Sequence, residues 1–130
     1  MRETLIKKAF EAMKNAYAPY SGYKVGSCVV CHDGTEFKGA NIENASYGAT
    51  NCGERSAIYA AYSAGYRQDD IKAIAIVSSG KTLASPCGIC RQVLAELLLE
   101  DTPIYLSNGE LNMDTNMKEL LPYSFGRKDL

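Results

Sequence analysis

Hydrophobic and polar positions follow two patterns along this chain, one typical of amphipathic helices and one typical of strands. Apolar residues at helical spacing predict helices over residues 5–17, 52–64, 86–98 and 116–121. Short apolar and β-branched runs predict about five strands, over residues 23–31, 36–40, 71–77, 104–106 and 111–113. The resulting order, α-β-β-α-β-α-β-β-α, predicts an α/β protein.

Turn and cap residues mark the ends of these segments. Asp33-Gly34 and Asn108-Gly109 are hairpin signals, and Gly65 is placed to cap the second helix. The third predicted strand is almost continuously apolar, as expected of a strand covered on both faces. We therefore expect a three-layer α/β/α sandwich around a mixed sheet of about five strands.

The composition narrows the class of protein. A chain of 130 residues fits a single domain, taken as residues 1–130, and 46% hydrophobic with 22% charged residues is ordinary for a globular protein. A formal net charge of -1 gives no basis for binding nucleic acid or an acidic membrane surface. No apolar run reaches the roughly 18 residues of a membrane span, and the first residues lack a signal-peptide pattern. We therefore expect a cytoplasmic protein whose cysteines are thiols.

Three cysteines and one glutamate form the pattern with the most specific chemistry. Cys87 and Cys90 lie in the first turn of a predicted helix, where both sulfurs can face one point. Cys52 begins another predicted helix, and the free amide N–H groups at helix starts stabilise thiolates. Three sulfurs leave one position of a tetrahedral zinc ion for water. Glu54 is suited to moving protons beside that position.

Two arginines directly follow these motifs. Three thiolates around Zn²⁺ leave a formal charge of about -1, which weakens the pull of the metal on its water. Arg55 and Arg91 would offset this charge as hydrogen-bond donors close to the sulfurs, together with the helix dipoles.

Other interpretations of the cysteines stay open at this point. Cys28 and Cys31 could form a closed four-cysteine site with Cys87 and Cys90, although the two pairs are much further apart than the roughly 15–20 residues typical of such sites. They are also explained as small buried residues. A redox dithiol at the second pair is another alternative. His32, the only histidine, adjoins a predicted turn and is expected at the surface.

With these residues the chain resembles the zinc-dependent nucleoside and base deaminases, whose signature is H-x-E followed by P-C-x-x-C. Cysteine takes the place of histidine here, as in the small, homotetrameric, three-cysteine cytidine deaminases, to which the similarity is greatest. Segments outside the zinc motifs also carry the resemblance, namely residues 18–21, 25–26, 41–47, 90–93 and 119–122. The segment 41–47 is the most specific, because deaminases that act on nucleic acids or on antibiotics are not expected to keep it.

The resemblance implies a reaction and a set of substrate contacts. The reaction is zinc-dependent hydrolytic deamination of cytidine and 2′-deoxycytidine in pyrimidine salvage, with Glu54 as base and then acid. Asn41 and Glu43 are expected to bind the ribose, and Tyr23 to lie against the pyrimidine. The substrate-binding residues that it implies are Tyr23, Asn41, Glu43, Ala45, Tyr47, Gly53 and Phe125. Gly53 replaces an alanine common in the family.

The resemblance also implies a homotetramer with shared active sites. Phe125 matches an aromatic residue that a neighbouring subunit contributes, and Ala45 and Tyr47 lie on segments that cross between subunits. A face formed by Tyr59, Tyr62 and Tyr66 is either interface or core.

Three rival functions are compatible with parts of this pattern. The first is deamination of a related aminopyrimidine nucleoside or antibiotic. The second is a zinc-stabilised structural or interaction domain, which would have no use for Glu54. The third is editing of nucleic acids, which the absence of a basic stripe disfavours.

Overall fold

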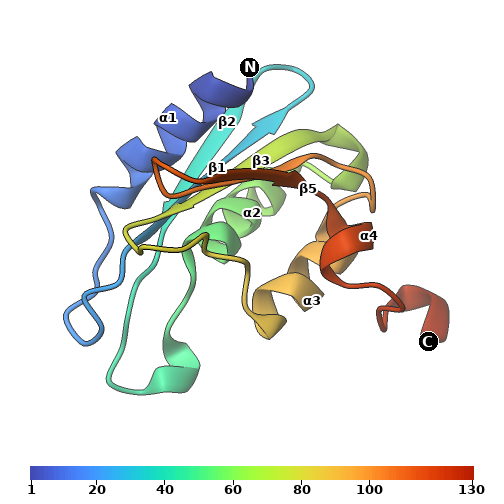
Figure 1. Cartoon of the computed structure of the whole chain (residues 1–130). Coiled ribbons are helices and arrows are strands. Elements are labelled where there is room, and N and C mark those ends of the chain that lie inside the picture. Colours follow the sequence, from blue (N-terminus) through green and yellow to red (C-terminus); the bar gives the residue numbers. More distant parts are fainter.

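The computed structural model describes residues 1–130 and shows one five-stranded sheet with helices on both faces (Figure 1). The helices are α1 (Arg2–Met13), α2 (Gly53–Ser63), α3 (Gly88–Leu97) and α4 (Met117–Leu120). The strands are β1 (Val25–Cys31), β2 (Glu36–Ala40), β3 (Ile71–Ser78), β4 (Ile104–Ser107) and β5 (Asn112–Thr115). Short 3₁₀ helices cover Tyr47–Ala49, Gln68–Asp70 and Arg127–Asp129.

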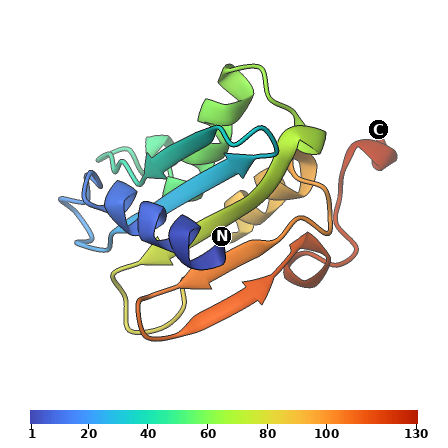
Figure 2. The same ribbon diagram turned by 90° about the horizontal axis from the view of Figure 1, so that it is seen from above.

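The sheet is mixed, as predicted. Its strand order is β2-β1-β3-β4-β5, with β3 and β4 parallel and every other neighbouring pair antiparallel. Helix α1 covers one face, and α2 and α3 cover the other (Figures 1 and 2). The expected α/β/α layering is therefore confirmed.

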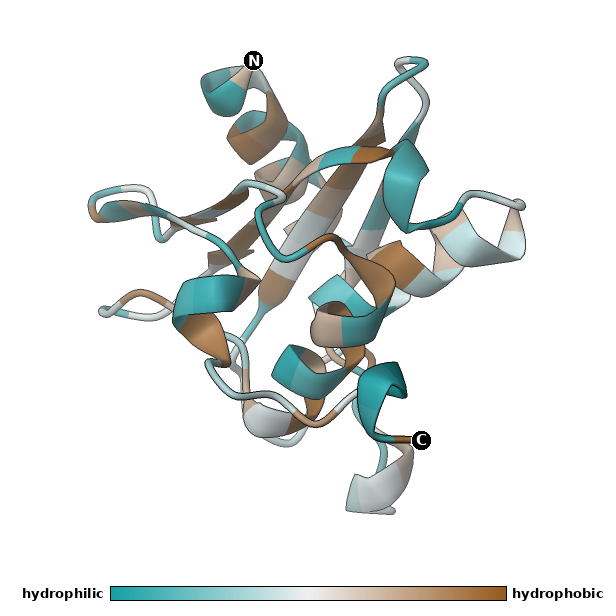
Figure 3. Cartoon of the chain, turned by 90° about the vertical axis from the view of Figure 1, so that its right-hand side faces the viewer, coloured by the Kyte–Doolittle hydropathy of each residue, from teal (hydrophilic) through white to brown (hydrophobic).

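Two separate apolar cores hold the three layers together. On the α1 face, Leu5 and Ala9 pack with alternate residues of β1 and β3. On the other face, Ile58 of α2 and Leu94 of α3 pack over Ile74 and its neighbours. Figure 3 shows the apolar residues of the central strands lying inside the molecule. Because β1 is buried along its whole length and β3 at every position except Lys72, both are covered on two faces.

Two glycines allow the helices to approach the sheet closely. A Cβ atom on Gly26 of β1 would lie 2.2 Å from the carbonyl oxygen of Ala9 in α1. A Cβ atom on Gly39 of β2 would lie 2.4 Å from the amide nitrogen of Ala57 in α2. In both cases the obstructing atom belongs to a helix backbone, which cannot move aside without shifting the whole helix.

We expect Gly26→Ala and Gly39→Ala each to lower the free energy of unfolding by about 1–3 kcal/mol or more, because they overpack a helix–sheet contact. Gly126→Ala is the matched control, since nothing lies within 4 Å of the added carbon and its φ of -164° is ordinary extended backbone. Denaturant unfolding of the three variants measures the difference. Wild-type stability of the first two would contradict this account of the packing.

The first helix is shorter than its apolar pattern predicts. We expected it to reach residue 17, and this was wrong, because α1 ends at Met13. The main chain of Tyr17 pairs instead with the segment before α2, since its N–H donates to Asn41 and its carbonyl accepts from Glu43. Tertiary pairing thus replaces the last helical turn.

The end of α2 follows its sequence signal. Gly65 has a φ of +97°, which favours glycine, and its N–H donates to the carbonyl of Tyr62. The N–H of Tyr66 donates to the carbonyl of Ala61, which completes a Schellman cap. None of the helices is long and apolar enough to span a membrane.

Candidate metal centre and active site

The sulfur atoms of Cys52, Cys87 and Cys90 come together, and all lie within 4.8 Å of one another. Cys52 is the N-cap residue of α2, and Cys87 is the N-cap residue of α3. Cys90 lies in the first turn of α3 and is fully buried. The two helix starts therefore converge on one point, as the spacing of the motifs predicts.

The surroundings of Cys52 favour its thiolate. Cys90 donates a hydrogen bond to its sulfur, and the Arg55 Nη2 donates to it over 3.4 Å, so the pKa of Cys52 falls to about 5. The same hydrogen bond and burial raise the pKa of Cys90. Binding of a metal ion to these sulfurs would release the protons that the thiols carry.

Glu54 lies beside the three sulfurs and has an unused acceptor. The residue is only 4% exposed, and its Oε1 atom has no hydrogen-bond partner in the chain. Burial, followed by the nearby charge of Cys52, raises the pKa of this carboxyl group to about 7. Burying a carboxylate oxygen without a hydrogen-bond partner costs folding free energy, unless a bound molecule donates a hydrogen bond to it.

These residues fit a zinc ion. Three sulfurs satisfy three of the four positions that zinc prefers, and the unpartnered Glu54 oxygen is available to a fourth group rather than to the protein. Arg55 supplies a positive charge next to one sulfur, which supports its predicted role.

The alternative cysteine arrangements do not fit the structure. Cys28 and Cys31 are buried, but neither belongs to the group of three sulfurs. Cys28 lies in the apolar core beneath α1, and burial raises its pKa to about 11. A closed zinc site formed by the pairs Cys28/Cys31 and Cys87/Cys90 is therefore excluded. A redox dithiol of Cys87 and Cys90 alone would leave the nearby sulfur of Cys52 unexplained. His32 is exposed, as predicted.

Arg91 is arranged differently from Arg55. Its guanidinium donates to the carbonyl oxygens of Pro86 at 2.7 Å and Leu120 at 2.6 Å, and to the hydroxyl of Ser85. No hydrogen bond joins it to a cysteine sulfur. We predicted that Arg91 donates to the thiolates. The structure shows instead that it binds main-chain carbonyls of two other segments.

The two residues expected to bind ribose already have protein partners. The Asn41 amide accepts from the N–H of Val25 at 2.9 Å and donates to the carbonyl of Tyr23 at 2.8 Å. The Glu43 carboxylate accepts from the N–H groups of Tyr20 and Ser21 at 3.0 and 3.1 Å.

Both residues keep some free hydrogen-bonding capacity. The Ser21 hydroxyl also donates to Glu43 and, as the largest cause, lowers the pKa of that carboxyl group. An amide has two donors and two acceptor sites, and a carboxylate has about four acceptor sites, so Asn41 and Glu43 each retain at least one.

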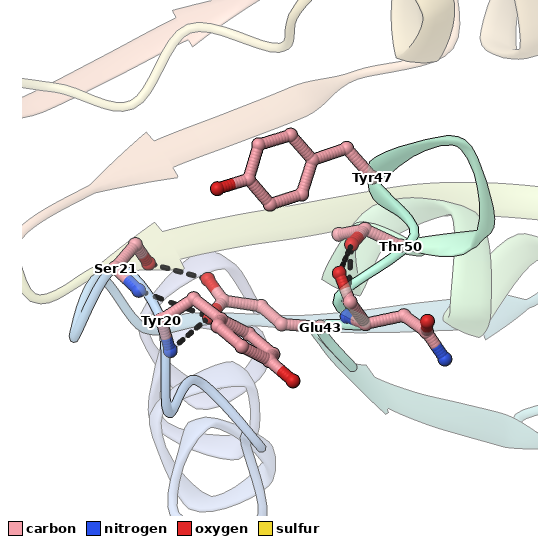
Figure 4. A pocket seen from close by; sticks show the side chains of 6 residues that line it. Tyr20, Ser21, Glu43, Tyr47 and Thr50 are labelled. Atoms are coloured by element: carbon pink, nitrogen blue, oxygen red, sulfur yellow. Dashed lines mark hydrogen bonds between the residues drawn. The ribbon is translucent and has the colours of Figure 1, made fainter.

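Glu43 lines a cavity of about 260 Å³ between the turn after α1 and the loop before α2 (Figure 4). The lining residues are Tyr20, Ser21, Glu43, Asn44, Tyr47 and Thr50. Tyr47 extends over this cavity and is 80% exposed. The cysteines are not among the lining residues, so this cavity and the sulfur group are two distinct parts of the candidate site.

The remaining predicted contacts come from different parts of the fold. The Tyr23 ring lies across Gly80, where an added Cβ would be 2.8 Å from the ring. Gly53 packs on Val25, and an alanine Cβ there would be 3.0 Å from the carbonyl oxygen of Val25. Ala45 lies exposed in the loop before α2.

Phe125 lies in the segment after α4 and is 59% exposed. Its side chain is free of the core of its own chain, while its carbonyl accepts from the Gln92 amide at 2.9 Å. The main chain of Phe125 is thus fixed by a hydrogen bond, while its ring remains exposed to solvent.

Sequence reasoning missed the residues that hold the predicted ones in place. Tyr20 and Ser21 position Glu43, and Thr50 places its carbonyl 3.5 Å from the Arg55 guanidinium. The segment 18–21 carried part of the resemblance, and that signal could have assigned the first two a role. Gly80 had no signal, because its significance depends on the position of Tyr23.

The comparisons with known proteins agree with this geometry. Residues 1–106 match the family described as the cytidine and deoxycytidylate deaminase zinc-binding region. A cytidine deaminase of Halalkalibacterium halodurans is 49% identical over 131 residues, which cover 99% of this chain and 97% of that protein. A cytidine deaminase of Sporosarcina psychrophila is 43% identical, over 98% of this chain and 93% of that protein.

A solved structure is also similar throughout. The crystal structure of cytidine deaminase from Burkholderia pseudomallei has a TM-score of 0.93 and 44% sequence identity, and the match covers 96% of this chain and 99% of that chain. The chain therefore belongs to the cytidine and deoxycytidylate deaminase family, a class of zinc-dependent hydrolases.

Proposed function

We propose that this chain is a cytidine deaminase that converts cytidine and 2′-deoxycytidine to uridine and 2′-deoxyuridine with release of ammonia. The observation that carries this proposal is a buried glutamate with a free oxygen beside three converging cysteine sulfurs. The decrease in ultraviolet absorbance of cytidine tests it directly. Turnover that a chelator abolishes and zinc restores is the expected result, and no turnover of any cytosine nucleoside would refute the proposal.

Cys52, Cys87 and Cys90 would hold the zinc ion. When bound, zinc acts as a Lewis acid that activates a water molecule for attack on the amino-bearing ring carbon. Arg55 balances part of the thiolate charge through its hydrogen bond to Cys52. The helix starts of α2 and α3 add further positive potential at the sulfurs.

Glu54 would move the protons of this reaction. Its carboxylate accepts a proton from the attacking water and delivers it to the ring nitrogen next to the reacting carbon, which makes that carbon more electrophilic. Glu54 then takes the proton of the hydroxyl group now on that carbon and passes it to the amino group, so that the carbon–nitrogen bond breaks, ammonia leaves and the carbonyl of uridine forms. A pKa near 7, raised by burial, suits a group that both accepts and donates a proton near neutral pH.

Asn41 and Glu43 would recognise the sugar. Their existing bonds to Val25, Tyr20 and Ser21 fix both side chains, and the free acceptor and donor positions can then meet a ribose hydroxyl. Tyr23 would contact the pyrimidine ring, and Ala45, Tyr47 and Gly53 would complete the substrate surface.

Free cytosine is expected to be a poor substrate, because it leaves the sugar-binding groups without partners. We expect kcat/KM for cytosine to be about 10⁴-fold or more below that for cytidine. Steady-state assays of both compounds measure this ratio. Comparable values would contradict the assignment of Asn41 and Glu43 to sugar recognition.

We further propose a homotetramer that shares its active sites and acts in cytoplasmic pyrimidine salvage. Several large apolar side chains are exposed on one chain, among them Tyr47, Tyr59, Ile89 and Phe125. Side chains of this size would be buried where they meet further copies of this chain. Light scattering and sedimentation measure the assembly, and a monomer with full activity would contradict shared sites.

Deamination of another aminopyrimidine nucleoside is the second candidate for the reaction. It uses the same zinc and glutamate chemistry, so the arrangement of Cys52, Cys87, Cys90 and Glu54 favours both. A panel of cytosine nucleosides with altered sugars separates them by kcat/KM.

A further inference from the structure

The segment that leads into Cys87 has few internal constraints. Between residues 81 and 86 the only hydrogen bond between main-chain groups runs from the N–H of Ser85 to the carbonyl of Leu83. Cys87 itself is exposed and precedes the first turn of α3. The carbonyl of Cys87 accepts from the N–H of Arg91, and the loop before it is held mainly by side chains.

Arg91 provides that connection. Its side chain folds back along α3, and Nε donates to the carbonyl of Pro86, the residue directly before Cys87. A second nitrogen donates to the hydroxyl of Ser85. Because Pro86 is buried, its carbonyl requires a protein partner, and the Arg91 guanidinium supplies one.

The same guanidinium also binds the C-terminal part of the chain. Nη1 donates to the carbonyl of Leu120 over 2.6 Å. Leu120 is the last residue of α4, and the carbonyls at a helix end have no partner within the helix. Three fixed donors of one planar group therefore join the Cys87 loop to α4.

We propose that Arg91 is a positioning residue that holds Cys87 in place for zinc by tying its loop to α4, rather than a counter-charge for the thiolates. This inference rests on the metal centre proposed above. Arg55 contacts a sulfur, whereas Arg91 contacts only carbonyl and hydroxyl oxygens. The geometry of the guanidinium is therefore the property that matters at this position.

Arg91→Lys separates the two roles, because lysine keeps the positive charge but loses the planar set of donors. We expect the variant to release zinc about 10- to 100-fold faster than the wild type, the loss typical of removing a partner that orients a ligand. Zinc-loaded protein is mixed with an excess of a chromogenic chelator, and the release rate is read directly. This measurement does not depend on deaminase activity.

Arg67→Lys is the matched control. Arg67 also donates to two main-chain carbonyls, those of Tyr62 and Tyr66, but at the far end of α2 from Cys52. We expect the zinc release rate of Arg67→Lys to stay within about twofold of the wild type, because Arg67 contacts no residue of the Cys87 loop. Melting temperatures with and without zinc should fall together in this control, whereas Arg91→Lys should lose part of the increase that zinc produces.

A second variant decides the question if Arg91→Lys does not fold. Ser85→Ala keeps the arginine and removes one of its three acceptors, so zinc release should be about 2- to 10-fold faster, as expected for one hydrogen bond. An Arg91→Lys protein with the wild-type release rate would overturn the proposal in favour of a charge effect. If only Ser85→Ala folds, an unchanged release rate overturns it equally.

Discussion

Glu54→Gln is expected to bind one zinc ion per chain as the wild type does and to lose roughly 10²–10⁴-fold in kcat, the contribution typical of a general acid–base residue. The amide has almost the same shape as the carboxylate but cannot accept and return a proton. The swap breaks no side-chain hydrogen bond at Oε1, because that oxygen has no partner in the chain. The fold and the metal should therefore remain intact while turnover fails.

On one preparation, metal analysis measures the zinc content, a thermal melt measures the stability of the fold, and a steady-state assay measures kcat. Glu110→Gln is the control, because Glu110 is exposed in the turn between β4 and β5 and should keep full activity. A Glu54→Gln protein with near-normal kcat would remove Glu54 from the chemistry. Loss of zinc in that variant would make Glu54 part of the metal site instead.

Cys87→Ala is expected to lose the zinc ion and with it at least about 10³-fold in kcat, since metal activation of water supplies several kcal/mol of the lowered barrier. Cys87 is exposed, so removing its sulfur leaves no cavity in the core. The loss can therefore be attributed to the metal rather than to unfolding. Elemental analysis of the purified protein and the cytidine assay test both parts.

Cys28→Ala is the matched control for this experiment. Its sulfur is fully buried beneath α1, away from the group of three cysteines. The variant should be somewhat less stable but should keep one zinc per chain and its activity. Retention of zinc by Cys87→Ala, or loss of zinc by Cys28→Ala, would contradict the assignment of the ligands.

Together the two experiments distinguish an enzyme from a structural zinc domain. A structural site would lose stability with the metal and would be indifferent to Glu54→Gln. An enzyme loses turnover in both variants and zinc in only one. The buried, unpartnered oxygen of Glu54 favours the second outcome.

Much of the fold could be predicted because it depends on local patterns. Gly65 and the Asp33-Gly34 turn have conformations that few other residues adopt, and β3 is apolar because both of its faces are covered. The end of α1 could not be predicted, since the bonds that compete with its last turn come from Asn41 and Glu43, far along the chain.

The predicted strand over residues 23–31 begins later in the structure for a similar reason. Strand β1 starts at Val25, and the Asn41 amide binds both the N–H of Val25 and the carbonyl of Tyr23. A side chain here takes the place of a neighbouring strand. No periodic pattern in the sequence records such a replacement.

The sequence by itself determined which residues could form the metal centre, because cysteines at helix starts with a glutamate two residues further on are typical of an open zinc site. The structure then excluded the other cysteine arrangements. Only the tertiary structure decided what each supporting residue contacts. Arg55 and Arg91 have the same place after their cysteine motifs, yet one reaches a sulfur and the other reaches the carbonyls of Pro86 and Leu120. The reason is physical: a ligand set depends on residue type and local spacing, whereas the reach of a long side chain depends on the neighbours that packing brings to it.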